Sequence, residues 1–245
     1  MKTHIHVITP IITEGFRSEE DLRACEGPEI TVTQCGIAYG PASIECEFDE
    51  ALSVPGILEK AIAAEREGAH AVVIDCMGDP GLAACREALS IPVLGPLQVA
   101  AHVATMLGHR FTFITVLDRL RAMIDHLVAG YGLTGNYAAF HAVDVPVLDI
   151  AHDTRKLGSL LGEKALTAVR DDHAGAVILG CTGFMGLAEV VTQTLREEGL
   201  EVPVIDAIPL TIRMADALVR CGLTHSKHIY PAPGKKEIRG YDNLR

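Results

Sequence analysis

Short apolar runs alternate with amphipathic stretches along almost the whole chain. The two most continuous runs are HAVVIDC at residues 70–76 and GAVILGC at residues 175–181. Runs that are apolar on both faces are typical of strands buried in the middle of a parallel sheet. Apolar residues also recur at helical spacing, most clearly in residues 118–130 and 154–171. The pattern therefore predicts an α/β protein in which strands and helices alternate.

The two halves of the chain repeat each other. HAVVIDC aligns with GAVILGC at a shift of 105 residues, and IPVLGPLQVAAHVATML aligns with VPVIDAIPLTIRMADAL at a shift of 111. Self-similarity of this kind implies two like units. We expect two similar αβα sandwich halves, each with a mostly parallel four-stranded sheet. A pseudo-twofold would relate them, with the active site in the cleft between them.

The repeat predicts where the halves lie along the chain. The first half is expected at residues 1–108, and the chain returns to it at about residues 207–222. The second half is expected at residues 109–206, followed by a tail at residues 223–245 to which we assign no chemistry.

Local signals in the first half predict its helices and its longest loop. Ser18 is expected to cap a short helix that ends near Gly27. The segment 36–50 contains glycine and proline and shows little periodicity, so it is predicted to be a long loop. Ser53 and Pro55 are predicted to start the helix that follows.

Composition and charge restrict the classes of partner and the cellular compartment that we expect. The 245 residues carry a net charge of −11, which argues against nucleic acid and anionic membranes as partners. No apolar run approaches the roughly 20 residues that span a bilayer. The N-terminus lacks the apolar core of a signal peptide, so we expect a cytoplasmic location. The seven cysteines include no CxxC pair and are expected to be reduced thiols.

Two of these cysteines carry the candidate chemistry. Cys76 and Cys181 each fall where a predicted strand ends, just before a loop that opens a helix, and ligands of open α/β sheets collect at that edge. A helix N-terminus lowers a thiol pKa toward neutral, as proton transfer requires. A thiolate on one face of a carbon and a thiol on the other would invert its configuration. Backbone amides at Met77–Gly78 and Thr182–Gly183 would hold the negative charge on a carbonyl oxygen.

Other polar residues have a structural interpretation beside the functional one. Asp79 precedes a proline, which favours a helix cap over a catalytic carboxylate. Asp75 is expected to point away from the cleft if its strand stays regular. For Ser43 and Glu45 in the long loop, and for Thr115 at a strand end, the residues alone leave ligand contact and a structural role equally open. The remaining cysteines are interpreted as small apolar residues.

Several segments resemble the aspartate/glutamate/hydantoin racemase superfamily. They are DCMGDPGL after the first of the two strands, LGCTG after its partner, and PASIE with FDEALSVPG in the long loop. The resemblance extends from residue 3 to about residue 222 and is greatest to the hydantoin and allantoin racemase branch. It implies cofactor-independent racemisation of a 5-monosubstituted hydantoin or an allantoin-like relative, with Cys76 and Cys181 as the acid–base pair.

The resemblance also implies a small-molecule substrate, its contacts and an assembly state. The chain is expected to form a homo-oligomer, namely a dimer, tetramer or hexamer, and to hold no metal. The candidate substrate-binding residues are Thr9, Ser43, Ile44, Met77, Gly78, Thr115, Val116, Thr182 and Gly183.

One segment departs from the branch, and three further functions stay open. Hydantoin racemases usually show Asn-Pro-Asn after the first strand, whereas this chain has Thr9-Pro10-Ile11. The departure bears on the substrate more than on the chemistry. The three further functions are an amino-acid racemase of the Asp/Glu type, a cysteine-nucleophile isomerase or decarboxylase of the same fold, and a non-enzymatic small-molecule-binding protein.

Overall fold

The computed structural model describes residues 2–241, which divide into two compact units. The first unit contains Phe48–Pro96 together with the described residues up to Ile44 and from Thr211 onward. The second unit contains Glu45–Glu47 and Leu97–Leu210. Leu97–Gly108, which the repeat assigned to the end of the first half, thus group with the second unit.

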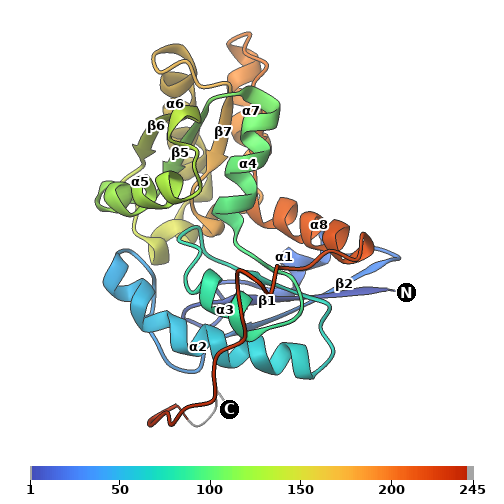
Figure 1. Ribbon diagram of the computed structural model, residues 1–245. Coiled ribbons are helices and arrows are strands. Elements are labelled where there is room, and N and C mark those ends of the chain that lie inside the picture. Colours follow the sequence, from blue (N-terminus) through green and yellow to red (C-terminus); the bar gives the residue numbers. More distant parts are fainter. Residues whose placement is uncertain (1, 242–245) are drawn as a thin grey trace. The chain divides into compact units, whose positions relative to one another are not determined.

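The first unit is built on a four-stranded parallel sheet with strand order β2-β1-β3-β4 (Figure 1). Residues Thr3 to Thr9 of β1 pair with Ile30 to Gly36 of β2, and Ile5 to Ile8 pair with Ala71 to Ile74 of β3. The strands are β1 (Thr3–Thr9), β2 (Ile30–Gly36), β3 (Ala71–Ile74) and β4 (Val93–Leu94), and the helices are α1 (Glu19–Arg23), α2 (Glu47–Arg66) and α3 (Leu82–Ala88).

The second unit has the same sheet topology, with strand order β6-β5-β7-β8 and all pairs parallel. Its strands are β5 (Phe111–Thr115), β6 (Tyr137–Ala142), β7 (Ala176–Leu179) and β8 (Val204–Ile205). Its α-helices are α4 (Pro96–Gly108), α5 (Arg121–Gly130), α6 (Thr154–Arg170) and α7 (Ala188–Glu197), and α8 (Ala207–Arg220) leads from this unit back to the first. Short 3₁₀ helices are η1 (Asp118–Leu120), η2 (Thr134–Asn136), η3 (Val147–His152) and η4 (Thr182–Phe184).

The strand positions confirm the sequence repeat. Residues Ala71–Ile74 of β3 and Ala176–Leu179 of β7 are separated by the predicted 105 residues. Val93–Leu94 of β4 and Val204–Ile205 of β8 are separated by the predicted 111. The α/β class with two similar halves is therefore confirmed.

The core of the first unit lies between its sheet and helices α2 and α3. Fully buried residues from all three elements meet there, among them Ile74 on β3, Ile57 on α2 and Cys85 on α3. Burying an aliphatic side chain of this size contributes about 1.5–3 kcal/mol, so this layer fixes the position of β3 and of the residues that follow it.

Helix α2 begins earlier than the sequence predicted. It starts at Glu47 instead of Ser53 or Pro55, and Pro55 lies inside it. Proline removes the hydrogen bond to the carbonyl of Ala51, but Ala51 is exposed, so water can replace that bond. Gly56 packs so tightly on Ile37 that an added Cβ would lie 2.9 Å from the Ile37 Cβ. Tertiary packing therefore outweighs the local proline signal. By contrast, the predicted cap at Ser18 is confirmed, because its hydroxyl accepts from the Asp21 N–H at 3.1 Å.

The predicted tail is partly attached to the first unit. The Val93 N–H donates to His225 Nε2 at 2.8 Å, and the Lys227 ammonium donates to the carbonyls of Arg86, Glu87 and Leu89. Burial, followed by the nearby Arg86 charge, lowers the pKa of His225 to about 4. These contacts hold the tail against β4 and the end of α3. Residues 242–245 of the predicted tail lie outside the described residues.

None of the helices in the described part of the chain combines the length and the apolar character needed to cross a membrane.

Candidate active site

Cys76 is the accessible residue of an otherwise buried segment. Every residue from Ala71 to Pro80 is buried except Cys76, which is half-buried. The Asp79 N–H donates to the Cys76 carbonyl at 3.1 Å and closes a turn directly after β3. Within this turn the Gly78 N–H donates to Cys76 Sγ at 3.5 Å. A backbone donor at this position stabilises a thiolate.

Cys181 occupies the equivalent position in the second unit. From Ala176 to Thr182 every residue is buried except Cys181, which is half-buried. The Phe184 N–H donates to the Cys181 carbonyl at 3.0 Å, as the Asp79 N–H does to Cys76. The two repeats therefore place a thiol at the carboxyl end of the same strand and at the start of the same turn.

The helices expected directly after the cysteines begin further along the chain. Helix α3 starts at Leu82 and α7 at Ala188, and η4 alone follows Cys181 directly. The turn after Cys76 is compact and buried, which delays the first α-helical residue. The amide near Cys76 Sγ therefore belongs to this turn and not to an α-helix N-terminus, which corrects the expected source of stabilisation.

Four of the five other cysteines have different surroundings, whereas Cys46 is half-buried like the two candidates. Cys25 and Cys85 are buried, and burial raises the pKa of the Cys85 thiol to about 12. Burial also raises the pKa of Cys35, whose sulfur lies 3.2 Å from His6 Nε2. Cys221 is exposed and directly follows α8. A raised pKa makes Cys35 and Cys85 poor sources of thiolate at neutral pH.

A buried ion pair immediately precedes Cys76. Asp75 is 2% exposed, and its carboxylate accepts from Arg17 Nε at 2.9 Å and from Arg17 Nη2 at 3.0 Å. The Thr9 hydroxyl donates to the same carboxylate at 3.1 Å. Sequence reasoning did not find this pair. The signal was present, because a carboxylate in a buried apolar run requires a partner.

The equivalent position in the second unit carries no charge. Gly180 takes the place of Asp75, and the Thr115 hydroxyl donates to its carbonyl at 2.7 Å. An added Cβ at Gly180 would overlap the Phe113 ring and lie 2.8 Å from the Ile114 carbonyl oxygen. Thr115 and Val116 are both buried. The second unit therefore leaves no room for a side chain before its cysteine.

Asp79 does not cap a helix as predicted. Its φ is +49°, and Gly81 is the N-cap residue of α3. The Asp79 carboxyl packs on Gly95, where an added Cβ would overlap it. Its backbone N–H donates to the Cys76 carbonyl, so Asp79 closes the turn that begins at Cys76.

The remaining candidates fall into both units. In the first unit, Met77 and Gly78 are buried in the turn, Ile44 is buried and Ser43 is half-buried. In the second unit, Thr182 is buried and Gly183 is half-buried. Glu45 belongs to the second unit, where its carboxylate accepts from the Val147 N–H at 2.8 Å, which gives it a structural role.

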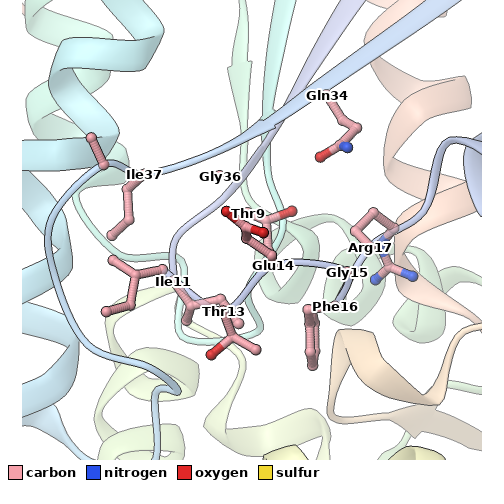
Figure 2. A pocket seen from close by; sticks show the side chains of 12 residues that line it. Thr9, Ile11, Thr13, Glu14, Gly15, Phe16, Arg17, Gln34, Gly36 and Ile37 are labelled. Carbon is pink, nitrogen blue, oxygen red and sulfur yellow. The ribbon is translucent and has the colours of Figure 1, made fainter.

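A cavity of about 410 Å³ lies at the carboxyl ends of β1 and β2 (Figure 2). Thr9 and Arg17, the two partners of Asp75, lie in its wall. Ile11 and Phe16 add apolar surface to the same wall. The cavity thus adjoins the network that precedes Cys76. Within residues 2–241, no three or more His, Cys, Asp or Glu side chains are grouped so as to hold a metal ion.

Comparison with known proteins gives the family. Residues 15–215 match the family model described as Asp/Glu/Hydantoin racemase. The chain belongs to this family. It is 39% identical to the hydantoin racemase of Pseudomonas sp. (strain NS671) over 241 residues, covering 96% of this chain and 94% of the relative.

Solved structures agree with this assignment. The allantoin racemase of Klebsiella pneumoniae superposes with a TM-score of 0.92 at 35% identity, and 99% of each chain is covered. A glutamate racemase of Bacillus anthracis superposes with a TM-score of 0.62 at 20% identity, covering 93% of this chain and 91% of that one. At this lower identity the likeness concerns the fold alone.

Proposed function

We propose that the protein is a cofactor-independent racemase of 5-monosubstituted hydantoins or of a close, allantoin-like relative. The observation that carries the proposal is the matched placement of Cys76 and Cys181. Each is the half-buried residue at the end of the same strand in its repeat, and each opens the same turn. The similarity to hydantoin and allantoin racemases supports this chemistry over amino-acid racemisation, nucleophilic isomerisation or ligand binding without turnover.

The proposed reaction moves one proton across one carbon. Cys76 as thiolate removes the proton from C5, and the electron pair of the C–H bond delocalises into the adjacent ring carbonyl. Cys181 as thiol then donates a proton to the opposite face, so that the carbon is inverted and the charge returns to a sulfur. For the other enantiomer the two roles exchange. This scheme requires the two units to close around the substrate across a cleft, with a pseudo-twofold relation between the thiols.

The proposed substrate contacts are mainly backbone groups. The Thr9 hydroxyl already donates to Asp75, and the Thr115 hydroxyl already donates to the Gly180 carbonyl. We therefore assign these two residues a role in supporting the site. The remaining proposed contacts are Ser43, Ile44, Met77, Gly78, Val116, Thr182 and Gly183.

The replacement of an amide by Ile11 bears on the substituent of the ring. Ile11 lines the cavity beside Arg17 at the place where the resemblance predicts a second asparagine, and polar side chains such as Glu14 and Gln34 line the same wall. Isoleucine offers no hydrogen bond to a polar substituent, whereas asparagine offers both a donor and an acceptor. We therefore expect Ile11→Asn to shift the ratio of the kcat/KM values for allantoin and for 5-alkyl hydantoins toward allantoin by about tenfold.

We further propose that the protein is cytoplasmic and acts as a homo-oligomer, namely a dimer, tetramer or hexamer. Light scattering after size-exclusion chromatography measures the assembly. A monomer that is fully active would contradict this part of the proposal.

The main experiment follows optical rotation and deuterium content of single-enantiomer hydantoins in D₂O. We expect rotation to decay while one deuterium enters C5. Cys76→Ser and Cys181→Ser should each lower the racemisation rate by about 10²–10⁴, the usual contribution of an acid or base. Cys221→Ser is the matched control, because this cysteine is exposed and far along the chain from both turns.

Each competing function gives a different result in the same experiment. Racemisation of aspartate or glutamate but not of hydantoins would indicate the amino-acid racemase. A covalent adduct on one cysteine, with no deuterium at C5, would indicate a nucleophilic isomerase. Ligand binding that survives the replacement of both cysteines, with no turnover, would indicate a binding protein.

A further inference from the structure

Arg17 and Asp75 form a charged pair in the first unit, and Asp75 directly precedes Cys76 in the chain. Both residues are almost completely buried, with 6% and 2% of their surface exposed. The guanidinium is bidentate, and Thr9 holds one oxygen of the same carboxylate. Asp75 is bonded directly to Cys76, so its charge lies within one residue of the thiol.

The position of Asp75 creates an electrostatic difficulty. A carboxylate near a thiol disfavours the thiolate, because like charges repel. Arg17 offsets that charge at hydrogen-bond distance. With both partners present their charges offset each other, whereas the removal of either one changes the net charge near Cys76 by one unit.

The same pair anchors the end of strand β3. Arg17 lies on the segment between β1 and α1, Thr9 is the last residue of β1, and Asp75 follows β3. The Asp75 N–H also donates to the Ile8 carbonyl at 2.8 Å, so both the backbone and the side chain of Asp75 are tied to β1. The turn that carries Cys76 begins from this fixed point.

We propose that Arg17 is a positioning residue for Cys76, acting through Asp75: it neutralises the adjacent carboxylate and fixes the start of the Cys76 turn. The proposal rests on the proposed function for the role of Cys76 in proton transfer. The second unit needs no such residue, because Gly180 precedes its cysteine.

The test measures the pH dependence of iodoacetamide alkylation at each cysteine by peptide-resolved mass spectrometry, on the intact wild-type chain and its variants. Iodoacetamide reacts with the thiolate, so the midpoint of each profile reports its formation. Fragment ions distinguish Cys76 from Cys85, which lies on the same tryptic peptide. The exposed Cys221, which lies on a different tryptic peptide, serves as an internal control in every sample.

Opposite shifts are expected from the two single variants. Arg17→Gln leaves the carboxylate unbalanced and should move the Cys76 midpoint to higher pH by about one unit. Asp75→Asn removes the negative charge next to Cys76 and should move the midpoint to lower pH by about the same amount. The double variant Arg17→Gln/Asp75→Asn should return close to wild type. The Cys221 midpoint should stay unchanged throughout, because Cys221 follows Arg220, which contacts Glu29 at the amino end of β2, whereas Asp75 lies at the carboxyl end of β3.

Turnover gives the second readout. Arg17→Gln should lower kcat for a hydantoin about tenfold at neutral pH, with KM changed less than about twofold, and raising the pH by about one unit should restore much of the rate. Arg23→Gln is the matched control on the neighbouring helix, since Arg23 is exposed and pairs only loosely with Glu19 at 4.0 Å. If Arg17→Gln does not fold, Arg17→Lys and Asp75→Asn carry the test, with no shift expected from the first and a downward shift from the second.

Two results would overturn the proposal. One is a shift of the Cys76 midpoint in the same direction for both single variants. The other is an equal shift at Cys76 and Cys221, which indicates an effect on the whole molecule and not a local one. The proposed function fails separately: if no hydantoin is racemised but the opposite shifts at Cys76 are seen, the pair acts on the thiol and the assigned reaction is wrong.

Discussion

The two units support their thiol-bearing turns with different chemistry. Each must end a buried strand and turn sharply while presenting a thiol. The first unit uses a buried carboxylate, Asp75, held by Arg17 and Thr9. The second uses Gly180, whose carbonyl accepts from Thr115. Thr9 and Thr115 each end a strand and each donate a hydroxyl, so a shared framework supports a charged anchor in one half and a neutral one in the other.

The difference teaches that duplicated halves can keep their geometry while their electrostatics diverge. A charged anchor fixes its turn strongly, but only while both charges are present. A glycine anchor carries no charge that must be neutralised, but it depends on close packing that tolerates no side chain. The two modes of support should therefore respond differently to substitution.

The largest effect is expected from breaking the ion pair. Arg17→Met removes the guanidinium that neutralises the buried Asp75 carboxylate, which should lower the free energy of unfolding by about 3–5 kcal/mol. The double variant Arg17→Met/Asp75→Leu removes both charges and should recover most of this loss. Urea denaturation of both variants measures it. A double variant as unstable as the single one would show that packing, and not charge, explains the loss.

The next effect is expected at the glycine of the second unit. Gly180→Ala forces a methyl group into the Phe113 ring and toward the Ile114 carbonyl, and should destabilise the protein by about 2–3 kcal/mol. Gly135→Ala is the control, because nothing lies within 4 Å of an added Cβ there. Urea denaturation compares the two. Equal stability of both variants would contradict the tight packing assigned to Gly180.

A direct comparison of the two anchors comes from the two threonines. Thr9→Val removes a hydrogen bond to a buried carboxylate and should cost about 2 kcal/mol, whereas Thr115→Val removes one to a neutral carbonyl and should cost about 1 kcal/mol. Both replacements preserve shape, so the difference in unfolding free energy reports the acceptor. If Thr115→Val cost more stability than Thr9→Val, the charged anchor would not be the stronger of the two.

The smallest effect concerns β4, the edge strand that the tail covers in the first unit. Neutral His225 accepts from the Val93 N–H, and its pKa of about 4 lies below the usual value of 6.5. The unfolded chain therefore binds the proton more readily, so this contribution to stability is complete above about pH 6.5 and is lost as the pH falls toward 4. His225→Ala should cost about 1 kcal/mol at neutral pH, a value discounted because the ring is half-exposed.

The control for this prediction is the exposed neighbour His228. Urea denaturation across the pH range should show the difference between wild type and His225→Ala shrinking as the pH falls, while His228→Ala follows wild type. A difference that stays constant down to pH 4 would rule out titration of His225 as its origin.

The sequence predicted the features that depend on local pattern. The apolar runs located β3 and β7, and their shift of 105 residues matched in the structure. The placement of Cys76 and Cys181 at the ends of these strands follows from the same runs. The Ser18 cap was predictable because its partner, Asp21, is only three residues away.

Other features were not predictable because their partners are distant in sequence. Helix α2 passes through Pro55, since Gly56 packs on Ile37 from another segment. Asp79 adopts a positive φ and packs on Gly95, so it does not cap α3. Neither contact can be inferred from the residues adjacent to Pro55 or to Asp79.

By itself, the sequence determined the α/β class, the repeat and the two thiols at strand ends, because hydrophobic periodicity and strand length act over a few neighbouring residues. Only the tertiary structure decided that Asp75 is paired with Arg17, 58 residues away, while Gly180 is shielded by Phe113. A buried charge must find its partner wherever the fold brings one. The carboxylate beside Cys76 is therefore visible in the local sequence, but its neutralisation by Arg17 is set by a tertiary contact.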